Sequence, residues 1–172
     1  MFLVTGNMAI ARTRHTATLL QNGTVLIVGT DDPYAEVYDP ATGSFTAVGS
    51  LSPYGGSPLV EAYAHTASLR ADGTVLIAGG FDYVVGRVVN FAGLCVYVTL
   101  PGSLAATALF APESGGFTAT GLLNTARDGH SATVLGDDTI LVVGGEKRTT
   151  FSNGFCHSTG VSQVLSSAEL FK

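Results

Sequence analysis

A five-residue segment that begins with histidine occurs three times in this chain, and this repeat constrains the fold more than any other feature. The copies span residues 15–19, 65–69 and 130–134. Each is followed by a turn, which contains Asn-Gly in the first copy, Asp-Gly in the second and Gly-Asp-Asp in the third. Asn-Gly and Asp-Gly adopt positive φ angles at low cost and favour two-residue β-hairpin loops. The regular recurrence therefore predicts an array of similar β units.

A near-continuous apolar run follows each turn and stops at glycine. A strand that is apolar on both sides is expected to be covered on both sides. The segments expected to form the second, third and fourth strands are 24–28, 35–40 and 43–46, then 74–78, 107–112 and 115–118, then 139–143 and 168–172. Four antiparallel strands per repeat are typical of a β-propeller blade. We therefore predict an all-β propeller fold with three blades in this chain.

Three features of the repeats resemble the bacterial variety of the Kelch repeat. They are the double glycine that closes the second strand, the Glu-x-Tyr-Asp-Pro third strand and the aromatic residue that opens the fourth strand. The resemblance implies a Kelch-type β-propeller. The departures from the family pattern are Thr30 in place of a second glycine, Phe45 and Phe117 in place of tryptophan, and Ala108 and Ala111 in place of acidic residues. Because of these departures, the binding residues of the family are not transferred to this chain.

The repeats differ mainly in the segment between their second and third strands. This segment is short in the first repeat, whereas the second and third repeats carry long inserts at 81–106 and 146–167. The predicted division of the chain is an orphan fourth strand at 1–7 and three blades at 8–49, 50–121 and 122–172. Both inserts and the extended approach at 52–61 are expected on one face of the propeller. We expect the inserts to be irregular loops that carry recognition.

Residues 1–7 match the fourth strand and its exit. Phe2 and Gly6 have the same spacing as Phe45 and Gly49, while the third repeat stops before a fourth strand. Closed propellers have typically 4 to 8 blades, so three blades leave two faces open. We therefore expect a head-to-tail homodimer that closes six blades, with each N-terminal strand completing the last blade of its partner. The alternative is that the chain is a piece of a longer propeller.

Several side chains on the insert-bearing face are candidates for ligand binding. Arg12 and Arg127 precede their repeat histidines by three residues, and their planar donor groups suit an anionic or carbohydrate ligand. The alternative is a structural salt bridge or the capping of backbone carbonyls. The predicted ligand-binding residues are Arg12, Tyr54, Tyr63, Arg127 and Asp128, with Glu61 beside them.

His15, His65 and His130 occupy one position of the repeat. Three histidines around an axis suggest a metal site or a proton relay. A polar residue repeated at one structural position is more typical of a hydrogen bond within the fold. No phosphate-binding loop or nucleophile-base arrangement stands out. We therefore predict no catalytic residue, no metal and no cofactor.

The charge distribution excludes nucleic acid as an expected partner. The net charge is −5, and the 8 basic residues are scattered instead of clustered. The most apolar long stretch, Phe91 to Phe110, is interrupted by Pro101 and Gly102, so a membrane span is not expected.

Cys95 and Cys156 lie in the two inserts. If the insert loops meet, these residues are able to form a disulfide, which would favour a secreted or periplasmic location. Two unrelated thiols are the alternative.

These observations lead to one functional hypothesis and one alternative. The hypothesis is a non-catalytic binding module that recognises a carbohydrate or a protein through its insert-bearing face. The alternative follows from the resemblance, because Kelch-type enzymes include oxidases similar to galactose oxidase and sugar mutarotases. An enzyme should place converging acid or base groups near the propeller axis.

Overall fold

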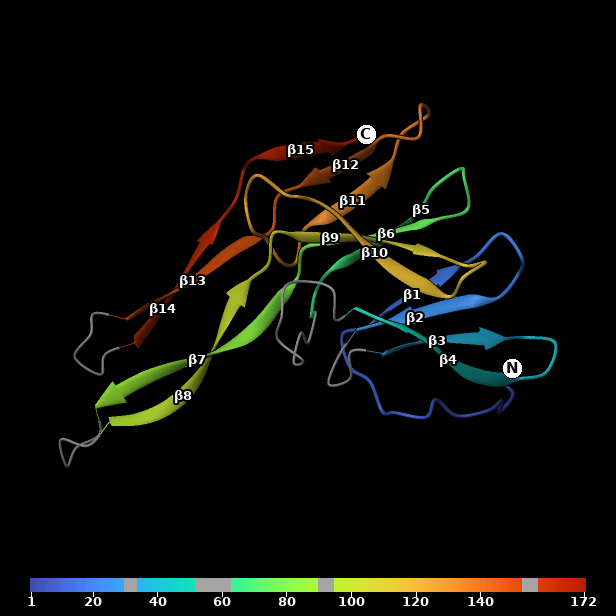
Figure 1. Ribbon diagram of the computed structural model, residues 1–172, viewed down its shortest axis with the longest axis horizontal. Helices are drawn as coiled ribbons and strands as arrows, with labels where there is room; N and C mark the ends of the chain where they lie inside the picture. Colours follow the sequence, from blue (N-terminus) through green and yellow to red (C-terminus); the bar gives the residue numbers. More distant parts are fainter. Residues whose placement is uncertain (30–33, 52–62, 90–94, 153–157) are drawn as a thin grey trace.

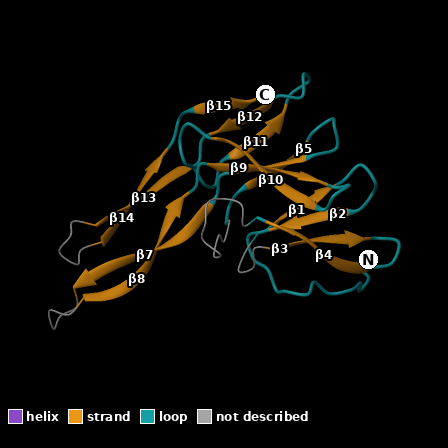
Figure 2. Ribbon diagram, viewed as in Figure 1, coloured by secondary structure: helices purple, strands orange, loops and turns teal. Residues whose placement is uncertain are grey.

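The computed structural model describes residues 1–29, 34–51, 63–89, 95–152 and 158–172, and these residues form an all-β protein (Figures 1 and 2). Three larger antiparallel sheets, called here sheets 1, 2 and 3, follow one another along the chain. The prediction of an all-β chain built from repeated antiparallel sheets is confirmed. Among the described residues, no helix has the length and apolarity needed to cross a membrane.

The strand order within the sheets follows the order of the repeat. Sheet 1 consists of β1 (Thr16–Leu19), β2 (Val25–Val28), β3 (Tyr34–Asp39) and β4 (Ser44–Ser50), in that spatial order. Sheet 2 consists of β5 (Thr66–Leu69), β6 (Val75–Ala78), β9 (Ala106–Ala111) and β10 (Gly116–Leu122), again in that order. Sheet 3 consists of β11 (Ser131–Val134), β12 (Ile140–Val143) and β15 (Ala168–Phe171).

The two long inserts form hairpins and not irregular loops, so that expectation was wrong. The first hairpin pairs β7 (Phe81–Val89) with β8 (Cys95–Ser103), and the second pairs β13 (Glu146–Ser152) with β14 (Ser158–Val164). Runs of β-branched residues in the sequence, such as those of β7, favour strands and were the overlooked signal. Both hairpins project from the same side of the sheets, and β13 contacts β7 and β8 (Figure 1).

The core consists of two apolar clusters, one between sheets 1 and 2 and one between sheets 2 and 3. Alternate residues of β6 pack into each of them. Val75 and Ile77 pack in the cluster between sheets 1 and 2, whereas Leu76 and Ala78 pack in the cluster between sheets 2 and 3. Successive side chains of a strand point to opposite faces, so a strand covered on both faces must be apolar throughout. The prediction drawn from the apolar runs is confirmed at β6.

The turns between the first two strands of each sheet are longer than the predicted two-residue loops. In sheet 1, the amide of Gly23 donates to the carbonyl of Leu20 over 3.0 Å, and the amide of Leu20 donates to Thr24 over 2.8 Å. The same pattern recurs at Leu135, where Asp138 takes the left-handed position with φ of 65°. This geometry is typical of a turn followed by a residue with positive φ, which Asn-Gly and Asp-Gly sequences also favour.

Candidate functional site

The bases of the two hairpins join the segments that lead into the first strands of sheets 2 and 3. Tyr63 forms an antiparallel bridge with Phe81, and Asp128 forms one with Glu146. In each case the second residue directly follows the double glycine that ends the second strand. The structure thus brings Tyr63 and Asp128, two of the predicted site residues, to neighbouring hairpin bases.

Phe81 forms an aromatic centre at the base of the first hairpin. Its ring is 5.1 Å from the ring of Tyr63, centroid to centroid, and the two rings stack at 23°. The guanidinium carbons of Arg148 and Arg14 lie 4.7 Å and 5.9 Å from the Phe81 centroid. A cation over an aromatic face is attracted by the ring quadrupole. Phe81 is only 2% exposed. This cluster therefore holds the hairpin base against the neighbouring segments and does not form an open binding surface.

Asp128 is paired within the protein. The hydroxyl of Ser103 donates to Asp128 Oδ2 over 2.6 Å, and Arg148 Nη2 lies 3.1 Å from Asp128 Oδ1. The amide of Arg148 in turn donates to the Ser103 hydroxyl over 2.7 Å. A buried carboxylate needs such partners, because desolvation without them is costly. The sequence analysis did not predict Ser103, Arg148 or Phe81, and the only signal was that Phe81 directly follows the double glycine of the second repeat.

Arg12 and Arg127 do not join this cluster, because each is buried in a network of its own. Arg12 Nε lies 3.1 Å from Glu36 Oε2, and its other two nitrogens donate to the carbonyls of Gly29 and Tyr34 over 2.9 and 2.8 Å. Its side chain is 0% exposed. This geometry favours the structural alternative that the sequence left open for this arginine.

Arg127 repeats the arrangement in sheet 3. Its Nη2 lies 2.6 Å from Glu169 Oε1, and its Nη1 donates to the carbonyls of Gly144 and Ser167. Burial opposes the charge of Glu169, but the backbone amide of Asn124 and the guanidinium of Arg127 hold the pKa of that carboxyl below its usual value. The two arginines therefore share one structural role.

A signal for these pairs was present in the sequence. The second repeat has Ala62 where the others have arginine, and Ala108 where the others have Glu36 and Glu169. The strand registers confirm the equivalence of Glu36, Ala108 and Glu169, which lie opposite equivalent residues of the second strands. Both members of the pair are therefore replaced together, as expected for two side chains that stabilise each other.

The repeat histidines connect neighbouring sheets. His65 Nε2 lies 2.8 Å from the Thr16 hydroxyl, and His130 Nε2 lies 2.9 Å from the Thr66 hydroxyl. Burial, helped by the nearby charges of Arg127 and His65, lowers the pKa of His130 to about 4. In the part of the chain that the structure describes, no group of His, Cys, Asp and Glu side chains is arranged to hold a metal ion. The geometry favours the hydrogen-bonding alternative for these histidines.

Some predicted residues lie outside the described ranges. Tyr54 and Glu61 belong to residues 52–62, and Cys156 belongs to residues 153–157. Their roles in ligand binding, and the disulfide between Cys156 and Cys95, stay predictions.

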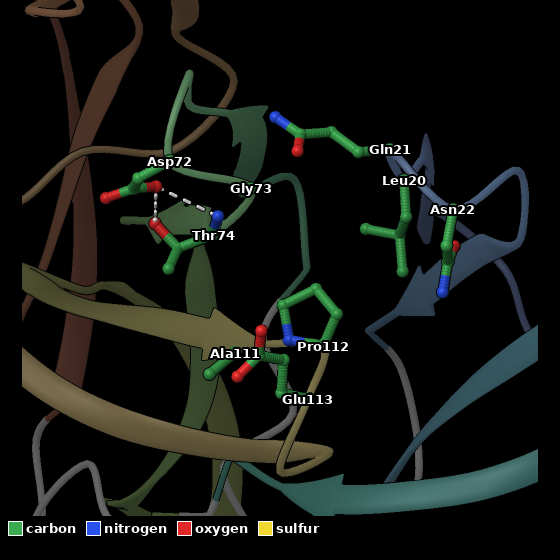
Figure 3. Close-up of a pocket in the computed structure, with 9 residues that line it drawn as sticks. All are labelled: Leu20, Gln21, Asn22, Asp72, Gly73, Thr74, Ala111, Pro112 and Glu113. Carbon is green, nitrogen blue, oxygen red and sulfur yellow. Dashed lines mark hydrogen bonds between the residues drawn. The ribbon is translucent and has the colours of Figure 1, made fainter.

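A cleft of about 410 Å³ is lined by turns of sheets 1 and 2 (Figure 3). These turns lie at the end of the sheets away from the hairpins (Figure 1). Three turns line it, with residues 20–22 before β2, 72–74 before β6 and 111–113 after β9. The Asp72 carboxylate accepts bonds from the amide and hydroxyl of Thr74, and these bonds lower its pKa. This carboxylate therefore stabilises its own turn, and the cleft is a weaker candidate than the hairpin-bearing end.

Comparison with known proteins identifies the fold alone. No family model matches the chain, and no curated protein matches it. Among solved structures, the structure of YjhT matches with a TM-score of 0.61 and 18% sequence identity, over 83% of this chain. The match covers 37% of YjhT, so the chain spans little more than a third of that protein.

Proposed function

We propose that this chain forms part of a Kelch-type β-propeller and acts as a non-catalytic binding module, with the two hairpins as its recognition surface. The supporting observation is that the hairpins project from one side of neighbouring sheets and contact each other. Long connections on a rigid scaffold are where binding residues concentrate. The double-glycine motif, the antiparallel four-stranded sheets and the likeness to YjhT support the propeller.

The connections at the hairpin bases support a surface held in a defined orientation. Ser103 connects the end of β8 to Asp128, and Arg148 connects β13 to both Asp128 and Phe81. Residues held by such contacts position the parts of a site that project beyond them. The acidic group at this place is already paired with a cation, which favours binding over acid-base catalysis.

The ligand class is a protein or a carbohydrate, and one feature of the second hairpin favours a protein. Val161 and Val164 lie on β14 and are 50% and 79% exposed. The two side chains are three residues apart and lie on opposite faces of β14, so each face of this strand offers exposed apolar surface to a protein partner.

The test is a binding screen with two defined probes, a phage-displayed peptide library and an oligosaccharide array. The variant replaces residues 83–101 by Asn-Gly, which joins Asp82 to its cross-strand partner Gly102. This truncation retains Ser103 and Leu104; the amide of Leu104 donates to Gly80 over 2.7 Å. We expect selected binders to lose affinity for this variant and for Val161→Asp.

The matched control is the double variant Gln21→Ala and Glu113→Ala, which changes the cleft at the opposite end of the sheets. Binders that recognise the hairpins should retain their affinity for it. Binders that lose affinity for the control and not for the truncated variant would contradict the proposal. Chemical conversion of an oligosaccharide on the array would support the enzyme alternative.

A further inference from the structure

The same hydroxyl-histidine contact joins each sheet to the next. The outer sheets each carry one of these two groups without the other. A hydroxyl of one sheet meets a histidine of the next, first as Thr16 with His65 and then as Thr66 with His130. The equivalent hydroxyl of sheet 3 belongs to Ser131, and the equivalent histidine of sheet 1 is His15. Both residues are exposed. The outer sheets thus carry complementary groups.

The segment 1–9 lies against sheet 1 in the way that a fourth strand lies against the next sheet. The Gly6 amide donates to the Gly43 carbonyl over 3.0 Å, just as the Gly49 amide donates to the Gly115 carbonyl over 2.6 Å. A Cβ on Gly6 or Gly49 would lie 2.2 or 2.6 Å from the same carbonyl oxygens, so both close approaches require glycine.

A second contact confirms the equivalence of this segment. The amide of Ala9 donates to Glu36 over 2.8 Å, and the amide of Asn124 donates to Glu169 over 2.6 Å. Asn124 follows β10, the fourth strand of sheet 2. Residues 1–9 therefore take the place of a fourth strand that belongs to a sheet before sheet 1, although they pair with no strand among the described residues.

Sheet 3 offers the edge that such a strand would complete. Within the described ranges, β15 pairs with β12 on one side and with no strand on the other. Leu170 of β15 and Val143 of β12 are 55% and 39% exposed, whereas Phe2 and Val4 are 104% and 102% exposed. Apolar side chains are thus exposed both on sheet 3 and on the N-terminal segment. Unpaired strand edges promote association.

We propose that sheet 3 binds a second copy of this chain head to tail, with residues 1–4 of the second copy as the fourth strand beside β15. The reciprocal contact closes a ring of six sheets. Ser131 then meets His15 of the second copy, which continues the hydroxyl-histidine series. This inference rests on the propeller fold proposed above and is independent of the ligand of the hairpins.

The repeat also defines the register of the added strand. Tyr38 lies opposite Phe45 with their rings 4.8 Å apart, and Phe110 lies opposite Phe117 with their rings 5.0 Å apart. The equivalent residue of sheet 3 is Phe171, and the equivalent of the second aromatic residue is Phe2. Phe171 therefore pairs with Phe2 of the second copy, and Leu170 pairs with Leu3.

Sedimentation equilibrium and native mass spectrometry of the intact chain at micromolar concentration test the proposal. We expect a dimer, a monomer after deletion of residues 1–4, and a dissociation constant raised about tenfold or more by Phe2→Ala, because buried aromatic residues dominate interfaces. Val161→Ala, on the second hairpin, is the matched control and should leave the dimer intact.

Disulfide formation then tests the register. Leu3→Cys combined with Leu170→Cys should form an intermolecular disulfide that peptide mapping identifies, whereas Leu3→Cys combined with Phe171→Cys should form little, since neighbouring residues point to opposite faces. A monomeric intact chain would overturn the proposal and indicate that another strand, such as one from a longer chain, covers this edge. Open polymers or cross-links in the wrong register would also overturn it. Neither result would affect the binding function assigned to the hairpins.

Discussion

The strands β6 and β12 are both apolar throughout but have different surroundings. In β6, which lies between two sheets, all four residues are buried, and the most exposed of them, Ile77, is 2% exposed. In β12, Ile140 and Val142 are 0% and 1% exposed and face sheet 2, whereas Val143 is 39% exposed. The comparison shows that an apolar run is fully buried only where sheets pack on both of its faces, as in β6.

Polar residues show the same dependence on position. His65 and His130 are buried and bonded to a threonine of the preceding sheet, whereas His15 is exposed. Sheets 1 and 3 also differ from sheet 2, because they contain the buried pairs of Arg12 with Glu36 and Arg127 with Glu169. The sequence of the second repeat has alanine at both positions.

The largest expected effect comes from breaking the ionic pair of sheet 3. Arg127→Ala should lower the free energy of unfolding by roughly 3 to 5 kcal/mol, because it leaves the Glu169 carboxylate without its cation and the carbonyls of Gly144 and Ser167 without the guanidinium donor. The double variant Arg127→Ala and Glu169→Ala reproduces the alanine pair of sheet 2 and should lose less than the sum of the single variants. Urea unfolding measures all three. Strictly additive losses would show that the two side chains do not act as a pair.

A smaller effect is expected from a matched pair of leucines. Leu76 in β6 and Leu141 in β12 are equivalent, but only Leu76 packs in the core between sheets 2 and 3. Leu76→Ala should lower the free energy of unfolding by about 2 to 5 kcal/mol, and Leu141→Ala by about 1 kcal/mol or less, when both are made in the variant that lacks residues 1–4. Chemical denaturation provides the comparison. Equal losses in that variant would mean that the outer face of sheet 3 is covered.

The last expected effect depends on pH. The pKa of His130 is about 4 in the folded chain, compared with 6.5 as the usual value, so the unfolded chain binds a proton more readily. Its contribution to stability is complete above pH 6.5 and is lost progressively as the pH falls towards 4. Thermal unfolding between pH 7 and pH 4 should show a steeper decline for the native chain than for His130→Gln. Parallel pH profiles would assign the acid sensitivity to other groups.

Most of the sheet structure could be predicted from residues near each other in the sequence. The histidine segments, the turns and the apolar runs marked the first two strands of every sheet, because strand alternation and turn conformation are local properties. The hairpins were not predicted, because the inserts have no counterpart in the first repeat, although their β-branched residues favour strands. The predicted site was recovered only in part, with Tyr63 and Asp128 at neighbouring hairpin bases and Arg12 and Arg127 in separate networks.

The sequence by itself determined that the chain is all-β and that antiparallel sheets repeat along it, because strand alternation and turn conformation are local. Only the tertiary structure decided what the conspicuous polar residues do. Arg127 is a structural residue because Glu169 and the carbonyl of Gly144 converge on it from segments distant in the chain. The three histidines have similar sequence contexts, yet His65 and His130 are buried against the preceding sheet whereas His15 is exposed. Hydrogen-bond partners that come from distant segments are set by the packing of the sheets, and no local pattern contains that information.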